Sequence, residues 1–211
     1  MSSSEHVESY YAASLSRPFT GARLSEDLRT EVIVIGGGYS GLSAALHLAQ
    51  QGHQVIVLEA HRVGWGASGR NGGQVCTGQR KEQDELEQML GMDHARALWV
   101  LSEEAKSTVR ELIEDNDIDC GYKSGIAHPD HKPGYAEHSR RYVDKLHSEY
   151  GYEQMSYLDR DEMARVTGSP SYFGGTLDRG AAHLHPLNYA QGLAHAALKL
   201  GVRIFVNCPV I

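Results

Sequence analysis

The sequence predicts an α/β protein built around a parallel βαβ unit, and three observations lead to this prediction. Four β-branched residues, Val32–Ile35, form a strand of the kind that is buried on both faces. A glycine-containing turn over residues 36–41 leads into a helical pattern over 42–50. A second apolar run, Val55–Leu58, ends at the acidic Glu59. Strand, turn, helix, strand and acid follow one another within about 30 residues, which is typical of a Rossmann-like dinucleotide-binding fingerprint.

Each glycine of this turn has a separate physical task. Gly36 makes the tight turn, Gly38 lets the backbone approach a pyrophosphate, and Gly41 lets the helix pack closely on the strand. The first amides of the helix then face an anion. Glu59 is placed to accept hydrogen bonds from the two hydroxyls of an adenosine ribose, and its charge disfavours a 2′-phosphate, so FAD or NAD fits better than NADP. A βαβ unit without a ligand is the alternative, but it has no need of three glycines and a terminal acid together.

Composition excludes several classes of partner. The 211 residues are 41% hydrophobic and 22% charged, with a net charge of −7, which is typical of a soluble globular protein and not of one that binds nucleic acid or anionic lipid. No apolar run approaches the roughly 20 residues that span a bilayer, and the amino terminus lacks a signal core. The three cysteines, Cys76, Cys120 and Cys208, are far apart and contain no CxxC pair. We therefore expect a cytoplasmic protein whose thiols are reduced and packed.

Periodicity and turn residues predict the remaining elements. An irregular surface arm over 1–29 is expected to be held by its aromatic residues. Helices are predicted over 81–90, 93–115, 134–149, 159–166 and 186–200. Asp93 and Asp159 are the predicted N-caps, and Glu162 completes a capping box with Asp159. Gly52 and Gly201 lie just beyond predicted helix ends. Strands are predicted around 120–122 and 125–128 and over 171–178 and 202–211. Because a final parallel strand leaves a sheet unfinished, we expect either the amino-terminal part of a longer enzyme or a truncated natural product.

Three segments carry a resemblance to a known family. They are the glycine turn and its flanks, residues 36–59, the loop Gly64-Trp-Gly-Ala-Ser-Gly-Arg-Asn-Gly-Gly-Gln74, and the run Gly180-Ala-Ala-His-Leu-His-Pro-Leu-Asn188. The chain resembles the FAD-dependent amine and amino-acid oxidases of the D-amino-acid oxidase superfamily, and among them most closely the gamma-glutamylputrescine oxidases. The likeness extends over essentially the whole chain but covers only about the first half of such an enzyme.

The resemblance implies a domain organisation and a cofactor. An arm, 1–29, precedes the first part of an FAD-binding domain, 30–116, then part of an α+β substrate domain, 117–180, and a return to the FAD-binding domain, 181–211. The cofactor-binding residues that the motif and the resemblance imply are Gly36, Gly38, Ser40, Gly41, Glu59, Ala60, Ser68, Arg70, Asn71, Gly72, Gly73 and Val210. Because the loop after Arg62 contains no histidine, we expect noncovalent FAD, with Cys76 a packed thiol. A flexible surface loop is the alternative, but it leaves Trp65 and the Asn-Gly-Gly run unexplained.

No metal site and no catalytic side chain are predicted. His183 and His185 are two residues apart and have no acidic or cysteine partner nearby, so we interpret them as structural, with Pro186 starting a helix. The implied reaction is the oxidation of an amine to an imine, with hydride transfer to the flavin and reduction of O2, or use of another electron acceptor. Sarcosine, glycine or a D-amino acid are alternative substrates. An NAD-dependent dehydrogenase and an inactive flavoprotein fragment are alternative functions.

Overall fold

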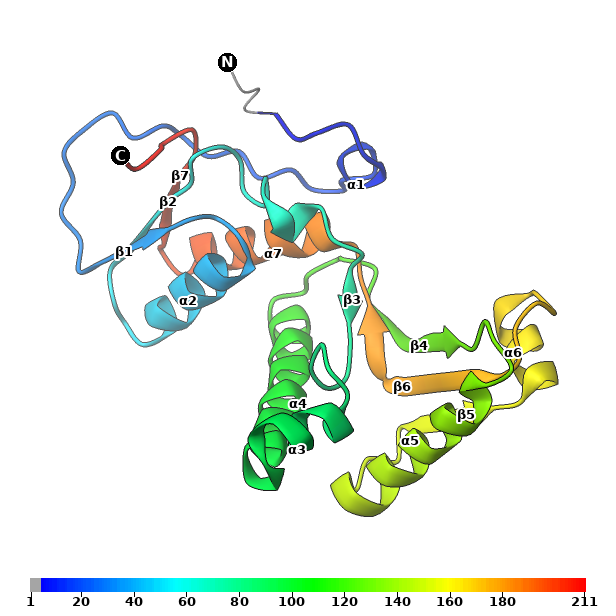
Figure 1. Ribbon diagram of the computed structural model, residues 1–211. Coiled ribbons are helices and arrows are strands. Elements are labelled where there is room, and N and C mark those ends of the chain that lie inside the picture. Colours follow the sequence, from blue (N-terminus) through cyan, green and yellow to red (C-terminus); the bar gives the residue numbers. More distant parts are fainter. Residues whose placement is uncertain (1–4) are drawn as a thin grey trace. The chain divides into compact units, whose positions relative to one another are not determined.

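The βαβ unit around the glycine turn has the order of elements that the sequence predicts, but its first strand is not buried on both faces, since Ile33 and Ile35 are exposed. In the computed structural model, which describes residues 5–211, β1 spans Val32–Ile35, α2 spans Tyr39–Gln50 and β2 spans Val55–Leu58 (Figure 1). The two strands are parallel, with Val32 opposite Val55. Gly52, just past α2, has a φ of 90°, the left-handed conformation expected after a helix end.

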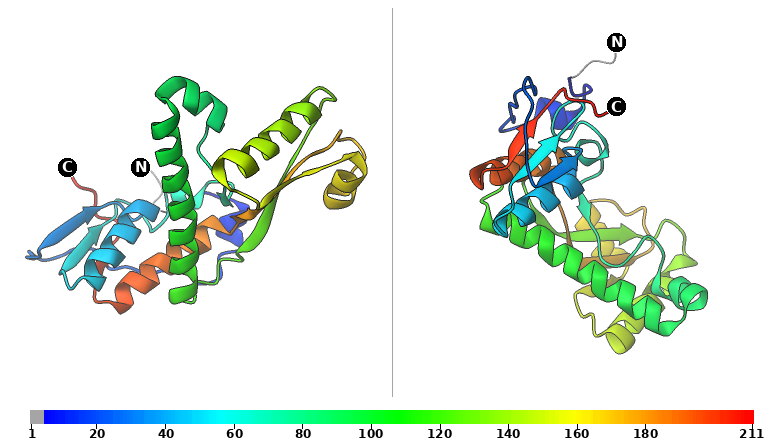
Figure 2. Two further views of the ribbon diagram at one scale, coloured as in Figure 1. Left: turned by 90° about the horizontal axis from the view of Figure 1, so that it is seen from below. Right: turned by 90° about the vertical axis from the view of Figure 1, so that its left-hand side faces the viewer.

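A third parallel strand, β7, extends the sheet of the first unit. β7 spans Arg203–Phe205 and pairs with β2, which gives the strand order β1-β2-β7. It is preceded by α7, Pro186–Lys199, which begins with proline as predicted. The helices α2 and α7 contact each other and lie side by side (Figure 1, Figure 2). The fully buried residues of these two helices include Leu42, Leu46, Leu193 and Ala194.

The chain divides into two compact units, and both are assembled from separate stretches of sequence. The first unit consists of the residues up to Gly73 together with Arg110–Tyr122 and Leu184–Ile211, and the second consists of Gln74–Val109 and Lys123–His183. Residues 74–109, assigned above to the FAD-binding domain over 30–116, pack in the second unit with the predicted substrate segment.

The second unit contains an antiparallel sheet. Its central strand is β6, Gly175–His183, which pairs with β4, Lys123–Pro129, along one edge and with β3, Gln74–Val75, and β5, Met155–Leu158, along the other. Its helices span Gln83–Leu90 (α3), Met92–Asp115 (α4, which continues into the first unit), Tyr135–Tyr150 (α5) and Arg160–Thr167 (α6). A buried apolar cluster lies between helices and sheet and consists of Trp99, Val143, Leu146, Tyr152 and Met155.

Several predicted boundaries were wrong for local reasons. Residues 120–122 form no strand, because Gly121 takes a φ of 60° and the Cys120 carbonyl accepts a hydrogen bond from the amide of His185. The last strand is shorter than predicted, since Asn207 takes a φ of 52° and the chain turns away. Helix α4 begins at Met92, so Asp93 lies in its first turn and is not its N-cap.

Two strands of the second unit also differ from the prediction. β5 was not predicted at all, and β6 begins at Gly175 and runs on to His183 in place of 171–178. The capping box of α6 is confirmed: the Asp159 carboxylate accepts the Glu162 amide at 2.9 Å, and the Glu162 carboxylate accepts the Asp159 amide at 2.9 Å.

The amino-terminal arm packs on α7, and its first four residues lie outside the described part of the chain. It contains one helical turn, α1, Tyr10–Ala13. The ring of Tyr11 meets that of His185 at 5.0 Å and the ring of Phe19 meets that of His195 at 5.5 Å, so aromatic residues hold the arm as predicted. Across residues 5–211, every helix is too short or too polar to cross a lipid bilayer.

Candidate FAD-binding site

The glycine turn brings two backbone segments closer than any other residue would allow. A Cβ atom on Gly41 would lie 2.1 Å from the carbonyl oxygen of Gly36, so α2 approaches β1 only because residue 41 has no side chain. Gly36 has a φ of 103°, which makes the turn itself. Gly38 is the N-cap of α2 and supplies no side-chain cap. The turn at Gly36 and the close helix packing at Gly41 are the tasks that the sequence predicted for these two glycines, whereas the approach of a pyrophosphate to Gly38 stays a prediction.

The first amides of α2 point away from the helix, toward the turn. Ser68 Oγ accepts the amide of Tyr39 at 3.0 Å, and the Gly38 carbonyl accepts that of Leu42 at 2.9 Å. Within residues 5–211, no acceptor lies on the amides of Ser40 and Gly41. Amides without an acceptor at a helix N-terminus suit an anionic group such as a pyrophosphate.

Glu59 is held in place at the carboxyl end of β2 by two backbone amides. Its Oε2 accepts the amide of Gly37 at 2.6 Å, and its Oε1 accepts the amide of His61 at 2.8 Å. The carboxylate therefore lies directly beside the glycine turn. A carboxylate can accept about four hydrogen bonds, so one acceptor position remains on each oxygen for the two hydroxyls of a ribose.

The returning chain after β7 runs along the Glu59 segment. The amide of Glu59 donates to the Phe205 carbonyl, the amide of Cys208 to the Glu59 carbonyl and the amide of Asn207 to the His61 carbonyl, at 2.8 to 2.9 Å. Val210 follows two residues later, outside β7, and its side chain is 53% exposed. This brings the segment that contains Val210 next to Glu59 and Ala60, although not on a strand as predicted.

The loop over 64–73 is shaped by its own side chains. The Asn71 carboxamide donates to the carbonyls of Ala67 and Ser68 at 3.0 and 3.1 Å, and its oxygen accepts the amide of Gly73 at 2.8 Å. Asn71 is therefore bonded within the loop and sets the path of the backbone that leads to Gly73. Gly73 has a φ of 71°, and a Cβ there would lie 2.0 Å from the Leu184 carbonyl oxygen.

A stack of flat side chains lies at the outer end of this loop. The rings of His61 and Trp65 are 3.9 Å apart, and the guanidinium of Arg70 lies 4.2 Å from the Trp65 ring. Arg70 Nε also donates to the Trp65 carbonyl at 2.7 Å. The sequence predicted Arg70 as a cofactor contact but gave no signal for this stack, which joins residues from two segments.

Tyr39 is a site residue that the sequence analysis missed. Its hydroxyl donates to the Pro186 carbonyl at 3.0 Å and accepts from Asn71 at 3.4 Å, so it ties α2 to the loop and to α7. Burial raises the pKa of Tyr39 to about 12, so its phenol stays protonated and donates. Nothing in the local sequence indicated this role, because both hydrogen-bond partners lie far from Tyr39 along the chain.

His185 is structural, in agreement with its interpretation from sequence. Its Nδ1 accepts the amide of Asn188 at 3.0 Å, which makes it the N-cap of α7 directly before Pro186. Burial lowers the pKa of His185, so the neutral ring that can accept this bond is favoured. Within residues 5–211, no three histidine, cysteine or acidic side chains come together as a metal site would require.

Three features of this site fit FAD: glycines where side chains would block the turn, helix amides open to a pyrophosphate, and a fixed carboxylate with two acceptor positions for a ribose. Each of these belongs to the dinucleotide part of the cofactor, so the geometry by itself allows FAD or NAD. The comparisons with known proteins resolve this ambiguity.

A family model described as "FAD dependent oxidoreductase" (DAO) matches residues 31–211. The chain is 42% identical to the probable oxidoreductase OrdL of Haemophilus influenzae, over 98% of this chain and 48% of that protein. It is 41% identical to the gamma-glutamylputrescine oxidoreductase of Escherichia coli K12, over 95% of this chain and 47% of that protein. The chain thus spans about half the length of the curated relatives it matches.

Solved structures agree with the fold. The L-amino acid deaminase of Proteus myxofaciens superposes with a TM-score of 0.73 at 20% identity, covering 92% of this chain and 42% of that one. The glycine oxidase of Bacillus cereus superposes with a TM-score of 0.67 at 22% identity, covering 85% and 48%. The sequence match over residues 31–211 shows that this chain belongs to the DAO family of FAD-dependent oxidoreductases.

Proposed function

We propose that this chain provides the FAD-binding part of an enzyme that oxidises the C–N bond of an amine to an imine and reduces O2 to hydrogen peroxide. Gamma-glutamylputrescine is the proposed substrate. The relative that is 41% identical over 95% of this chain and carries that substrate in its name supports this choice. Sarcosine, glycine and D-amino acids are the alternative substrates of the same reaction class.

The observation that carries the proposal is the position of Glu59 beside the glycine turn, with both carboxylate oxygens held by backbone amides. In the proposed complex, Glu59 binds the adenosine ribose and the amides of Ser40 and Gly41 bind the pyrophosphate. Ala60 and the segment containing Val210 would flank the adenine. FAD, bound noncovalently, would accept the hydride from the substrate carbon next to the amine nitrogen.

The chain's own residues would orient the reacting groups. Asn71 fixes the loop so that the backbone at Gly72 and Gly73 can approach a flat ring closely. The hydroxyl oxygen of Ser68 accepts a hydrogen bond from the Tyr39 amide. The proposed role of Ser68 is therefore to hold the start of α2 in place as well as to line the cofactor. We assign no general acid or base, since hydride transfer from a neutral amine needs only position and a dry surrounding.

The inactive-fragment alternative is supported by one feature of the sheet. β1 lies at the edge of the sheet order, and its outward-facing Ile33 and Ile35 are 59% and 68% exposed. Parallel sheets are normally covered on both faces, so residues outside this chain would have to cover this one. The NAD alternative loses its support, because the matching family is one of FAD-dependent enzymes.

The test is the absorption spectrum of the purified protein, followed by peroxide release with a panel of amines. We expect bound flavin that is released by denaturation, and peroxide with gamma-glutamylputrescine at rates above those with sarcosine, glycine and D-alanine. A protein that folds cooperatively but holds no flavin contradicts the site. If a dye reoxidises the reduced flavin but O2 does not, only the proposed use of O2 as electron acceptor is contradicted. Faster turnover of another panel member contradicts the proposed substrate.

A further inference from the structure

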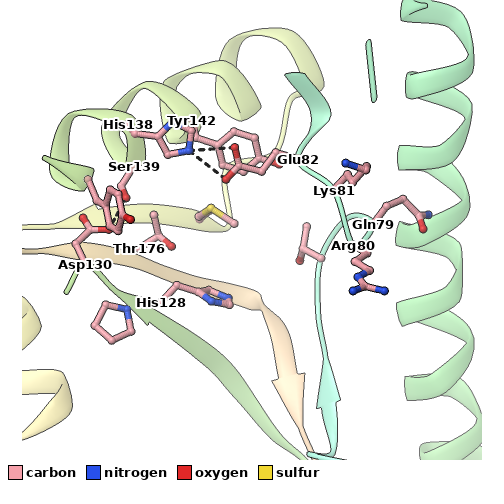
Figure 3. A pocket seen from close by; sticks show the side chains of 14 residues that line it. Gln79, Arg80, Lys81, Glu82, His128, Asp130, His138, Ser139, Tyr142 and Thr176 are labelled. Atoms are coloured by element: carbon pink, nitrogen blue, oxygen red, sulfur yellow. Dashed lines mark hydrogen bonds and ion pairs between the residues drawn. The ribbon is translucent and has the colours of Figure 1, made fainter. Parts of the chain in front are cut away.

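A cavity of about 520 Å³ lies within the second unit, between α5 and the sheet (Figure 3). Its floor is formed by β4, β5 and β6, one wall by the first half of α5, and the opposite wall by the segment 77–82 before α3. Cavities of about 300 to 1,000 Å³ are the usual size for sites that enclose a small molecule.

The lining of this cavity combines apolar side chains, such as Tyr142 and Met155, with polar ones that the packing of a helix on a sheet does not require. Further along the same interface, α5 packs on the sheet through Val143, Leu146 and Met155, which form an apolar core. At the cavity, this part of the second unit also presents His128, Thr176 and Asp130, of which Thr176 and Asp130 are buried and His128 is exposed. His128 lies opposite Thr176 in the antiparallel register, and Asp130, two residues on, faces the same side. Buried polar side chains such as Thr176 and Asp130 need hydrogen-bond partners, which a bound molecule could supply.

Asp130 is the most unusual of these residues. Its side chain is buried, with 7% exposed, and one carboxylate oxygen, Oδ1, accepts the hydroxyl of Ser139 at 2.8 Å. The other oxygen, Oδ2, has no hydrogen-bond donor within residues 5–211. A buried carboxylate oxygen without a donor is unfavourable, and a charged N–H donor such as an ammonium group makes one of the strongest hydrogen bonds to it.

The opposite wall carries positive charge. Arg80 and Lys81 lie across the cavity from Asp130 (Figure 3). Lys81 is paired with Glu85, and Glu82 is paired with His138 of α5 at 3.0 Å. Arg80, by contrast, makes no ion pair or hydrogen bond with any residue that the structure describes. The cavity therefore offers an unsatisfied anion on one wall and an uncommitted guanidinium on the other.

We propose that this cavity binds a small zwitterionic molecule of the amino-acid class, with its ammonium group on Asp130 and its carboxylate on Arg80. Asp130 accepts the charged N–H groups, and Arg80 binds the carboxylate with its two parallel N–H donors. The site uses none of the residues assigned to the cofactor, so it is a second ligand site in addition to the proposed function.

The test is calorimetric titration of the purified FAD-loaded protein with zwitterions of increasing length: glycine, β-alanine, 4-aminobutyrate and 6-aminohexanoate. Butylamine and butyrate each carry one of the two charges. We expect one zwitterion to bind best, because the two charged residues are a fixed distance apart, and both single-charge probes to bind at least about tenfold more weakly, a difference of about 1.4 kcal/mol.

Variants identify the site of binding. Asp130→Asn and Arg80→Gln should each weaken the best zwitterion by at least about tenfold, the typical effect of losing one charged hydrogen bond. Asp144→Asn on the exposed side of α5 and Arg96→Gln on α4 remove the same charges away from the cavity and should leave binding unchanged. Because Arg80 is exposed, its variant should fold even if the Asp130 variant does not.

Three results would overturn the proposal: no measurable binding of any zwitterion, binding that neither cavity variant weakens, or butylamine binding as tightly as the best zwitterion. The readout is binding heat and not turnover. An enzyme that fails to oxidise amines therefore leaves this proposal standing, and an active enzyme does not rescue it.

Discussion

Replacing Glu59 with glutamine removes one acceptor at the centre of the proposed cofactor site and changes its shape very little. Both partners of the carboxylate are donors, the amides of Gly37 and His61 at 2.6 and 2.8 Å. A glutamine has one acceptor oxygen and one NH2 group, so one backbone amide must face a donor. The same NH2 group cannot accept a ribose hydroxyl, so bound FAD loses one hydrogen bond to a charged acceptor.

The magnitude follows from this count. One hydrogen bond to a charged group contributes about 1.5 to 3 kcal/mol, which raises the dissociation constant of FAD about 10- to 150-fold. The unpaired backbone amide lowers the unfolding free energy of the FAD-free protein by about 1 to 3 kcal/mol in addition. The two losses are separate, because the first concerns the ribose and the second concerns Gly37 or His61.

The assay is titration of FAD into FAD-free protein, followed by the change in flavin fluorescence, together with urea unfolding of the FAD-free form. Glu31→Gln is the matched control: Glu31 accepts the amide of Gln54 at 3.0 Å beside the other end of the strands, so it makes the same chemical change away from the turn. We expect no change in FAD affinity there. If Glu59→Gln binds FAD as tightly as the unchanged protein, the ribose does not lie on Glu59 and the assigned site is wrong.

Three further predictions follow from single contacts. Gly41→Ala places a Cβ atom 2.1 Å from a backbone oxygen across the turn. It should lower the unfolding free energy by about 1 to 3 kcal/mol and abolish FAD retention. In the control Gly134→Ala the new Cβ meets no atom within 4 Å, so neither the unfolding free energy nor FAD retention should change. Tyr152→Phe removes the hydroxyl that donates to the buried Asp178 at 2.6 Å, so urea unfolding should show a loss of about 1.5 to 3 kcal/mol, and a loss below about 0.5 kcal/mol would contradict it. Burial lowers the pKa of His185 below its ordinary 6.5, so the unfolded chain takes up the proton first as the pH falls. The free energy of unfolding should therefore decrease as the pH falls past about 6.5. His185→Asn keeps an N-cap acceptor that does not titrate, so its unfolding free energy should decrease less over the same pH range.

The parts of the fold that were predictable depend on residues close together in sequence. The βαβ unit was predicted to within a few residues, because the turn glycines, the apolar strands and Gly52 lie within one short stretch. The capping box of Asp159 and Glu162 was predictable for the same reason, since both hydrogen bonds join residues three apart. Local sequence determines such features almost completely.

The parts that were not predictable depend on partners far away in the chain. β5 is a short strand with a mixed pattern, and its residues are extended because they pair with β6, where Met155 lies opposite Asp178. The packing of residues 74–109 in the second unit likewise requires contacts with residues beyond 123. Periodicity carries no information about such partners, so the sequence assigned this stretch to the neighbouring domain.

The cofactor site shows both kinds of dependence at one residue. The position of Glu59 at the end of β2 is local and was predicted, but its main chain is also held by Phe205 and Cys208 after the chain has returned from the second unit. The carboxylate and its two amide donors belong to the local motif, whereas the backbone that would flank the adenine depends on α7 and β7 forming correctly. A variant that disturbs the return, such as a larger residue at Gly192, where a Cβ would lie 2.2 Å from Ile118 Cγ2, should therefore weaken FAD binding without touching any residue of the glycine motif. FAD affinity and the free energy of unfolding are measured together in Gly192→Ala. If FAD affinity falls only as far as the unfolding free energy does, the returning segment is needed for folding alone. If FAD affinity falls while the unfolding free energy is unchanged, the effect lies at the adenine side of the site.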